Sequence, residues 1–193
     1  MKRKVITAVA ILISITVNAQ WEVGLGAGAA LPITRYKEVL KTGWLLKADG
    51  QYRFKSGKFA LGMKAHLTRL QKDNNPNDQF QNARMTIAPL LFTAEWTIPT
   101  KGNLQPYLTG GLGISFFNLN YEVSPGDGKT VFNVSFTMMP EAGLRYKASE
   151  NLFPFIETSL VVLADGPPIG FPKSSKATGY NAITAGVVYK FKK

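Results

Sequence analysis

Apolar and polar residues alternate along most of the chain from Trp21 onward. A period of two is typical of β-strands, whose side chains point in turn to opposite faces. Eight such segments can be drawn, at about 21–31, 41–54, 59–71, 84–98, 105–121, 130–146, 152–163 and 179–191. They are longer than the five or six residues usual in soluble strands, and they reach the roughly 9 to 11 that a tilted membrane-spanning strand requires. The pattern predicts an all-β fold, an eight-stranded antiparallel up-and-down transmembrane β-barrel.

The alternation gives each predicted strand one apolar and one polar face. In 130–146 the apolar parity includes Phe132 and Val134, and the polar parity includes Asn133 and Ser135. Three apolar residues fall on the nominally polar face of their segments: Ile87, Leu91 and Phe117. A soluble lipocalin-like barrel would turn the apolar face inward, and the charges alone do not decide between the two arrangements.

The connections and the aromatic residues favour the membrane. Short connections (55–58, 99–104 and 147–151) alternate with mostly longer ones (32–40, 72–83, 122–129 and 164–178). In outer-membrane barrels the short turns are periplasmic, and an even strand count places both termini on that side. Each predicted strand has an aromatic residue at its short-turn end, which predicts a periplasmic girdle of Trp21, Phe54, Phe59, Trp96, Tyr107, Tyr146, Phe153 and Phe191. A sparser outer girdle would consist of Trp44, Tyr121, Phe132 and Tyr180.

The first nineteen residues have the pattern of a secretory signal peptide. Lys2, Arg3 and Lys4 precede an apolar run from Val5 to Val17, and Ala19 follows at the small-residue cleavage position. The run is shorter than the roughly 20 residues of a spanning helix. We therefore expect a signal peptide over 1–19 and one outer-membrane barrel domain over 20–193.

Composition narrows the possible chemistry. The chain has no cysteine, which removes disulfides and thiolate sites. Its formal net charge is +11, and losing the three leader cations would leave 11 − 3 = +8. The basic residues are spread along the chain instead of forming a stripe, so we expect no nucleic acid as a partner and anionic lipid as the counter-charge.

A resemblance adds to this interpretation. The leader ending in Asn18 and Ala19, the eight alternating segments, the glycine-rich stretches at 24–28 and 110–113 and the final 187–191 resemble the outer-membrane protein beta-barrel domain family, with its OmpA-like and OmpX-like small barrels. The likeness covers the mature chain. It implies outer-membrane lipid as a partner, with other envelope proteins as further candidates, and the aromatic last strand is similar to the signal read by the barrel-insertion machinery. Two lysines follow Phe191, which departs from that signal.

The polar face is predicted to line the lumen, which eight strands leave just wide enough for side chains to fill. The predicted lumen ion network consists of Glu22, Lys47, Asp49, Arg53, Lys64, His66, Glu95, Glu141, Arg145, Glu157 and Lys190. Five acids face five bases, as buried charges require. The network is interpreted as a plug, with a narrow ion or proton path as the alternative.

No catalytic, metal or cofactor site is predicted. His66 is the only histidine, and Ser115, Ser135 and Ser159 share its inward parity, but an enzyme acting on lipid would have to face the lipid. The sequence therefore predicts a non-enzymatic barrel with a structural or adaptor role in the outer membrane or in a membrane-associated complex. A narrow channel and a lipid-modifying enzyme are the alternatives.

Overall fold

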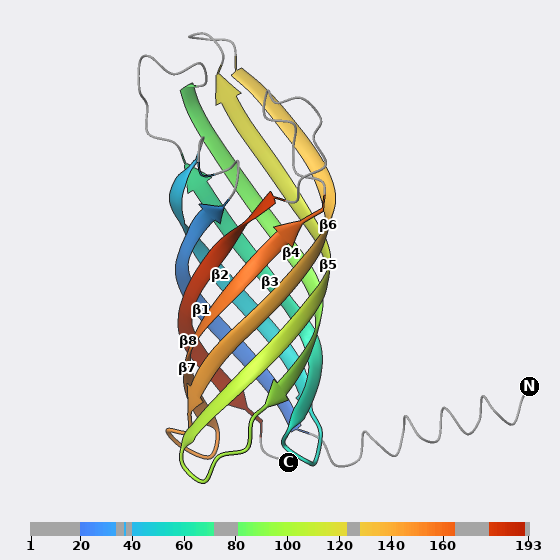
Figure 1. Ribbon diagram of the computed structural model, residues 1–193, viewed down its shortest axis with the longest axis vertical. Helices are drawn as coiled ribbons and strands as arrows, with labels where there is room; N and C mark the ends of the chain where they lie inside the picture. Colours follow the sequence, from blue (N-terminus) through green and yellow to red (C-terminus); the bar gives the residue numbers. More distant parts are fainter. Residues whose placement is uncertain are drawn as a thin grey trace, which may run out of the picture.

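A computed structural model describes residues 20–33, 37, 40–71, 81–122, 128–164 and 178–191. Eight strands form one closed antiparallel barrel in which neighbours in the sequence are neighbours in space (Figure 1). They are β1 (Gln20–Ile33), β2 (Lys41–Arg53), β3 (Phe59–Gln71), β4 (Gln81–Thr97), β5 (Leu104–Glu122), β6 (Gly128–Tyr146), β7 (Leu152–Leu163) and β8 (Thr178–Lys190). The predicted fold class is confirmed. The predicted leader lies outside the described residues, among which no helix is long and apolar enough to cross a membrane.

Pairing between the first and last strands closes the sheet. β1 and β8 are antiparallel from Glu22 opposite Lys190 to Ile33 opposite Gly179. Closure leaves no sheet edge around the wall, which matters because the hydrocarbon interior of a bilayer offers no water to unpaired backbone groups.

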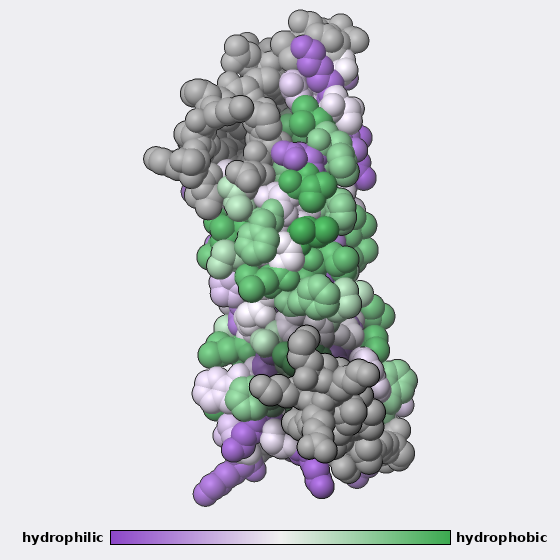
Figure 2. Space-filling view, turned by 90° about the vertical axis from the view of Figure 1, so that its right-hand side faces the viewer, coloured by the Kyte–Doolittle hydropathy of each residue, from purple (hydrophilic) through white to green (hydrophobic). Residues whose placement is uncertain are grey.

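The two parities of each strand face different surroundings. Apolar side chains of one parity lie on the outside, among them Leu25, Phe92 and Phe132, which are 64%, 70% and 65% exposed. Figure 2 shows such side chains covering the middle of the barrel wall, with polar ones toward the ends. Side chains of the other parity are buried in the lumen, such as Glu22, Ser135 and Glu157. The surface that faces outward therefore suits lipid.

Three short connections lie at one end of the barrel, which we call the turn end: residues 54–58, 98–103 and 147–151. The first is closed by backbone hydrogen bonds from Gly57 N to Phe54 O at 2.9 Å and from Phe54 N to Phe59 O at 3.0 Å. Gly57 has a φ of 70°, a conformation that glycine adopts without strain. β1 begins and β8 ends at this end as well, which is the lower end in Figure 1.

We call the opposite end of the barrel the loop end. The longest strands are β5 and β6. They pair with each other from Leu104 opposite Tyr146 to Glu122 opposite Gly128, whereas β6 pairs with β7 only between Thr137 and Arg145. The hairpin, together with the start of β4, whose Gln81 is opposite Glu122, therefore rises beyond the other strands (Figure 1). The β6–β7 register skips Met139 and Pro140, and the proline has no N–H to donate.

An arginine at an outward-facing position halfway along β2 tests the lipid contact. Leu46→Arg should lower the free energy of unfolding by about 2 to 4 kcal/mol, because the charge would lie near the bilayer midplane. Reversible denaturant unfolding in lipid vesicles measures this. Ser56→Arg, in an exposed turn, is the matched control and should change stability by less than about 0.5 kcal/mol. Equal effects of the two substitutions would contradict a lipid-facing β2.

Cysteine labelling tests the orientation. The natural chain has no cysteine, so a single one at Ser56 in a short turn or at Gly128 at the loop end is a unique label. An impermeant maleimide should label the variant Gly128→Cys on intact cells and Ser56→Cys only after the outer membrane is opened, because short turns are periplasmic. The reverse pattern would show that the barrel is inserted the other way round.

Candidate functional site

The lumen is divided along its axis into a charged zone toward the turn end and an apolar zone toward the loop end. The predicted network residues all lie on the lumen side of their strands, and nine of the charged ones are at most 8% exposed: Glu22, Lys47, Asp49, Arg53, Lys64, Glu95, Glu141, Arg145 and Glu157. Lys190 is half-buried at the mouth of the barrel. The charged side chains form two clusters.

The turn-end cluster consists of Glu22, Arg53, Glu95 and Arg145. Arg53 Nε donates to Glu22 Oε1 at 2.7 Å, and Arg53 Nη2 donates to Glu95 Oε1 at 2.6 Å. Arg145 holds Glu95 with both of its terminal nitrogens, Nη1 donating to Oε1 at 2.7 Å and Nη2 to Oε2. The planar fork of a guanidinium matches the two oxygens of a carboxylate, which makes such pairs strong and directional. Four side chains from four strands are thereby tied across the lumen.

The middle cluster consists of Lys47, Asp49, Lys64, Glu141 and Glu157. Lys47 Nζ donates to Glu157 Oε1 and lies 3.5 Å from Asp49 Oδ1, while Lys64 Nζ donates to Glu141 Oε1. The two hydrogen-bonded pairs join β2 to β7 and β3 to β6, which are not neighbours in the sheet, so these two pairs cross the lumen, whereas Lys47 and Asp49 share β2.

Tyr107 connects the two clusters. Its hydroxyl donates to Glu157 Oε2 at 2.7 Å, and the Arg145 guanidinium carbon lies 4.2 Å from the centre of its ring. A cation over an aromatic face is attracted by the electron density of the ring. The charged zone is therefore one connected network.

His66 lies beside this network without taking part in its hydrogen bonds. It is opposite Lys47 in the β2–β3 register, and neither ring nitrogen has a hydrogen-bond partner in the described part of the chain. Ser115 pairs instead with the hydroxyl of Thr137 at 2.6 Å. No serine among the described residues is placed to be activated by this histidine, and these residues contain no group of three or more metal-ligating side chains.

The apolar layer fills the lumen above the charged zone. Its buried members are Ala30, Leu40, Leu45, Leu70, Ala83, Met85, Ile87, Leu91, Phe117, Leu119, Met139, Val161, Leu163, Tyr180 and Ala182. Sequence reasoning missed this layer, although Ile87, Leu91 and Phe117 stand out in the sequence as apolar residues on the inward parity. These three residues indicate the layer, because apolar side chains that fill part of the lumen take the place of polar residues at the inward-facing positions there.

Glycines make room for the charged network. A Cβ at Gly24 would lie 2.6 Å from the Asp49 carboxylate oxygens, and one at Gly143 would collide with the ring of Tyr107. Both glycines face inward. Gly24 is opposite Asp49 in the β1–β2 register, and Gly143 is opposite Tyr107 in the β5–β6 register. Their missing side chains allow the larger ones to cross the lumen.

Two members of the predicted periplasmic girdle were assigned wrongly. Tyr107 and Phe153 are 2% and 7% exposed and point into the lumen, where Phe153 packs with Phe155 and Val188. Each shares the parity of inward-facing neighbours, and strand parity decides the face whatever the height of the residue. Tyr180, expected in the outer girdle, also points inward and accepts a hydrogen bond from Thr68 at 3.0 Å.

Five girdle residues are exposed on the outside: Trp21, Phe59, Trp96, Tyr146 and Phe191. Phe54 is half-buried and forms an edge contact with Tyr52, 5.6 Å between ring centres. Tyr52 in turn meets Trp21 at 5.5 Å, and Tyr189 meets Phe191 at 5.1 Å. The two outward-facing tyrosines of these contacts were missing from the predicted girdle. Aromatic rings at such a level suit the boundary between lipid and water.

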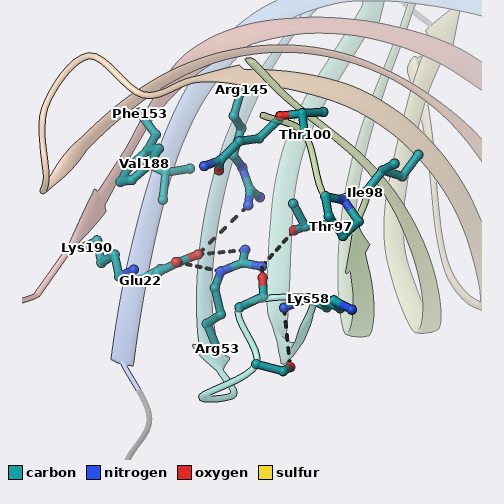
Figure 3. Close-up of a pocket in the computed structure, with 14 residues that line it drawn as sticks. Glu22, Arg53, Lys58, Thr97, Ile98, Thr100, Arg145, Phe153, Val188 and Lys190 are labelled. Carbon is teal, nitrogen blue, oxygen red and sulfur yellow. Dashed lines mark hydrogen bonds and ion pairs between the residues drawn. The ribbon is translucent and has the colours of Figure 1, made fainter. Parts of the chain in front are cut away.

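A pocket lies inside the barrel at its turn end. Its cavity volume is about 260 Å³. Figure 3 shows Glu22, Arg53 and Arg145 of the turn-end cluster on its inner side, Phe153 and Val188 on one wall, Lys190 at the rim, and Thr97, Ile98 and Thr100 on the other wall. We call it the mouth pocket. The lumen above it is occupied by the side chains of the network and of the apolar layer.

A closed barrel with an apolar outer wall and a polar network inside defines an integral membrane protein of the β-barrel class. A family model described as the outer membrane protein beta-barrel domain matches residues 5–191, so the chain belongs to this family and is an outer-membrane protein. The resemblance seen in the sequence is confirmed. A search of curated proteins found no match.

Solved structures share the fold at low sequence identity. The chain is similar to Neisserial surface protein A, with 16% identity, a TM-score of 0.62 and coverage of 90% of this chain and 99% of that one. It is similar to OprG from Pseudomonas aeruginosa, with 13% identity, a TM-score of 0.58 and coverage of 91% and 97%. A major outer membrane protein from Thermus thermophilus gives 14% identity, a TM-score of 0.56 and coverage of 90% and 99%.

Filling the space left by Gly143 tests how tightly the network is packed. Gly143→Ala should lower the free energy of unfolding by about 1 to 3 kcal/mol, because the new methyl group must displace the ring of Tyr107. Gly110→Ala is the matched control, since a Cβ there meets nothing within 4 Å, and it should raise stability by about 0.5 kcal/mol. Denaturant unfolding in vesicles compares them, and a neutral Gly143→Ala would contradict the packing described.

Proposed function

We propose that this protein is a non-enzymatic structural or adaptor component of the outer membrane, with a lumen closed by its own side chains. The observation that carries the proposal is the double filling of the lumen, by the ion-pair network and by the apolar layer. Contacts with other molecules would then be made by the outer wall and by the two ends of the barrel. The partners would be outer-membrane lipid and other envelope proteins, with the barrel-insertion machinery during assembly.

The narrow-channel alternative is disfavoured by both zones. An ion crossing the middle cluster would have to replace the bonds that Lys47 and Lys64 make with Glu157 and Glu141. Removing one partner from a buried ion pair lowers the stability of a protein by about 3 to 5 kcal/mol. The ion would next meet the apolar layer, where Leu91, Phe117 and Met139 are at most 1% exposed and offer it no polar ligand.

The lipid-modifying-enzyme alternative needs a nucleophile and a base that meet at the lipid. His66 is 4% exposed inside the barrel and is hydrogen-bonded to no hydroxyl among the described residues. Its position favours a structural role at the upper edge of the network. A chromosomal deletion offers a check, because it should leave the acyl chains and head groups of the outer-membrane lipid unchanged by mass spectrometry.

Planar bilayer recording tests the closed lumen. The intact protein should give no stable conductance steps of porin size, because eight strands leave little space beyond their inward side chains. A known porin inserted in the same bilayer is the positive control. Stable porin-sized steps from the unmodified chain would overturn the proposal.

A further inference from the structure

The mouth pocket combines a cavity with spare positive charge. Counting the ionic groups around it, the cations Arg53, Arg145, Lys58 and Lys190 face the carboxylates Glu22 and Glu95, which leaves 4 − 2 = +2. The excess belongs to the two lysines, because the arginines and carboxylates neutralise one another in the turn-end cluster.

The donors of Arg53 are already used. Its Nε and Nη2 hold Glu22 and Glu95, and its Nη1 donates to Thr97 Oγ1 at 2.8 Å and to the Gly57 carbonyl at 3.2 Å. Arg53 therefore serves as a fixed part of the pocket floor and has no hydrogen left for a ligand.

Arg145 and Lys190 keep unused donors. Arg145 Nε is buried and has no hydrogen-bond partner among the described residues, although both terminal nitrogens hold Glu95. Lys190 is opposite Glu22 in the β1–β8 register, yet its ammonium group lies within 4 Å of no carboxylate in the described part of the chain. Buried or half-buried cationic donors without partners favour an anionic acceptor.

The surroundings reinforce this charge. The three short turns carry Lys55, Lys58, Lys101 and Lys147 against one acid, Glu150. A surface with one dominant sign of charge attracts ligands of the opposite sign and raises their local concentration. The pocket also has an apolar wall of Phe153 and Val188, which suits a ligand whose anionic group is attached to an apolar body (Figure 3).

We propose that the mouth pocket binds an anionic group, a carboxylate or a phosphate, that reaches it from the periplasm, with Lys190 as the donor, Arg145 as a positive charge in the lining and Lys58 at the rim. The anion can be borne by a soluble periplasmic molecule or by a phospholipid head group of the inner leaflet. Binding at the mouth requires no opening of the lumen, so this proposal stands or falls separately from the closed-channel function.

Phosphate is the probe. Full-length protein, labelled with ¹⁵N, is placed in phosphatidylcholine nanodiscs and titrated with inorganic phosphate at constant ionic strength. The side-chain Nε–Hε signal of Arg145 should shift saturably. A second arm replaces part of the phosphatidylcholine by phosphatidylglycerol without added phosphate, and a shift of the same signal in this arm identifies the lipid head group as the source. Absence of a saturable shift in both arms would overturn the proposal.

Lysine variants distinguish phosphate binding in the pocket from a general effect of surface charge. Lys190→Gln should weaken phosphate binding by at least about tenfold, as expected for the loss of a charge-assisted hydrogen bond. Lys58→Gln, in an exposed turn that tolerates change, should weaken it less and keeps the test valid if Lys190→Gln fails to fold. Lys55→Gln is the matched control: it removes the same charge from the same turn, but Lys55 does not line the pocket. Equal weakening by Lys55→Gln and Lys58→Gln, with Lys190→Gln unchanged or unfolded, would reduce the effect to surface charge and overturn the pocket.

Discussion

The constraint on which the structure depends is that backbone N–H and C=O groups in a bilayer must find partners within the protein. The pairing of β1 with β8 meets it by closing the sheet. Closure then fixes the direction of each side chain, because a pleated strand in a closed wall has one face in lipid and one in the lumen. A ring of eight strands encloses so little space that the inward side chains must fill it, and their chemistry becomes the chemistry of the lumen.

The two zones of the lumen solve that packing problem differently. Near the turn end, charged side chains cross the lumen and are held by carboxylate–cation pairs, with Gly24 and Gly143 leaving the space they need. Toward the loop end, apolar residues such as Leu91 and Phe117 fill the space without polar groups that would require partners. Buried charges are costly unless paired, so the five acids and the four buried bases on the inward parity must act together, while Lys190 lies half-buried at the mouth outside these pairs. Tyr107 joins the clusters and makes a single network of them.

The sequence predicts the strands well because a period of two over long segments has few other interpretations, and the observed bounds lie within a few residues of the expected ones. It also predicts which charges face inward. It does not predict their pairing: Lys47 and Glu157 are 110 positions apart, and only the register around the closed barrel brings them together. The girdle failed at Tyr107 and Phe153 because height along the strand was used without parity. The apolar layer was missed because three exceptions were treated as irregularities of the pattern.

A filled lumen restricts where such a protein can recognise anything. The outer wall faces lipid, and paired charges and apolar side chains occupy the lumen above the mouth pocket, which favours recognition at the barrel ends. At the turn end the strands are joined by short turns that carry lysines, and two hydrogen bonds tie Arg53 to Glu22 in the floor of the mouth pocket. A floor tied in this way, with unused donors in Arg145 and Lys190, lowers the cost of ordering that a ligand would otherwise bear. The same ion pairs that close the lumen thus shape the cavity that opens at its mouth.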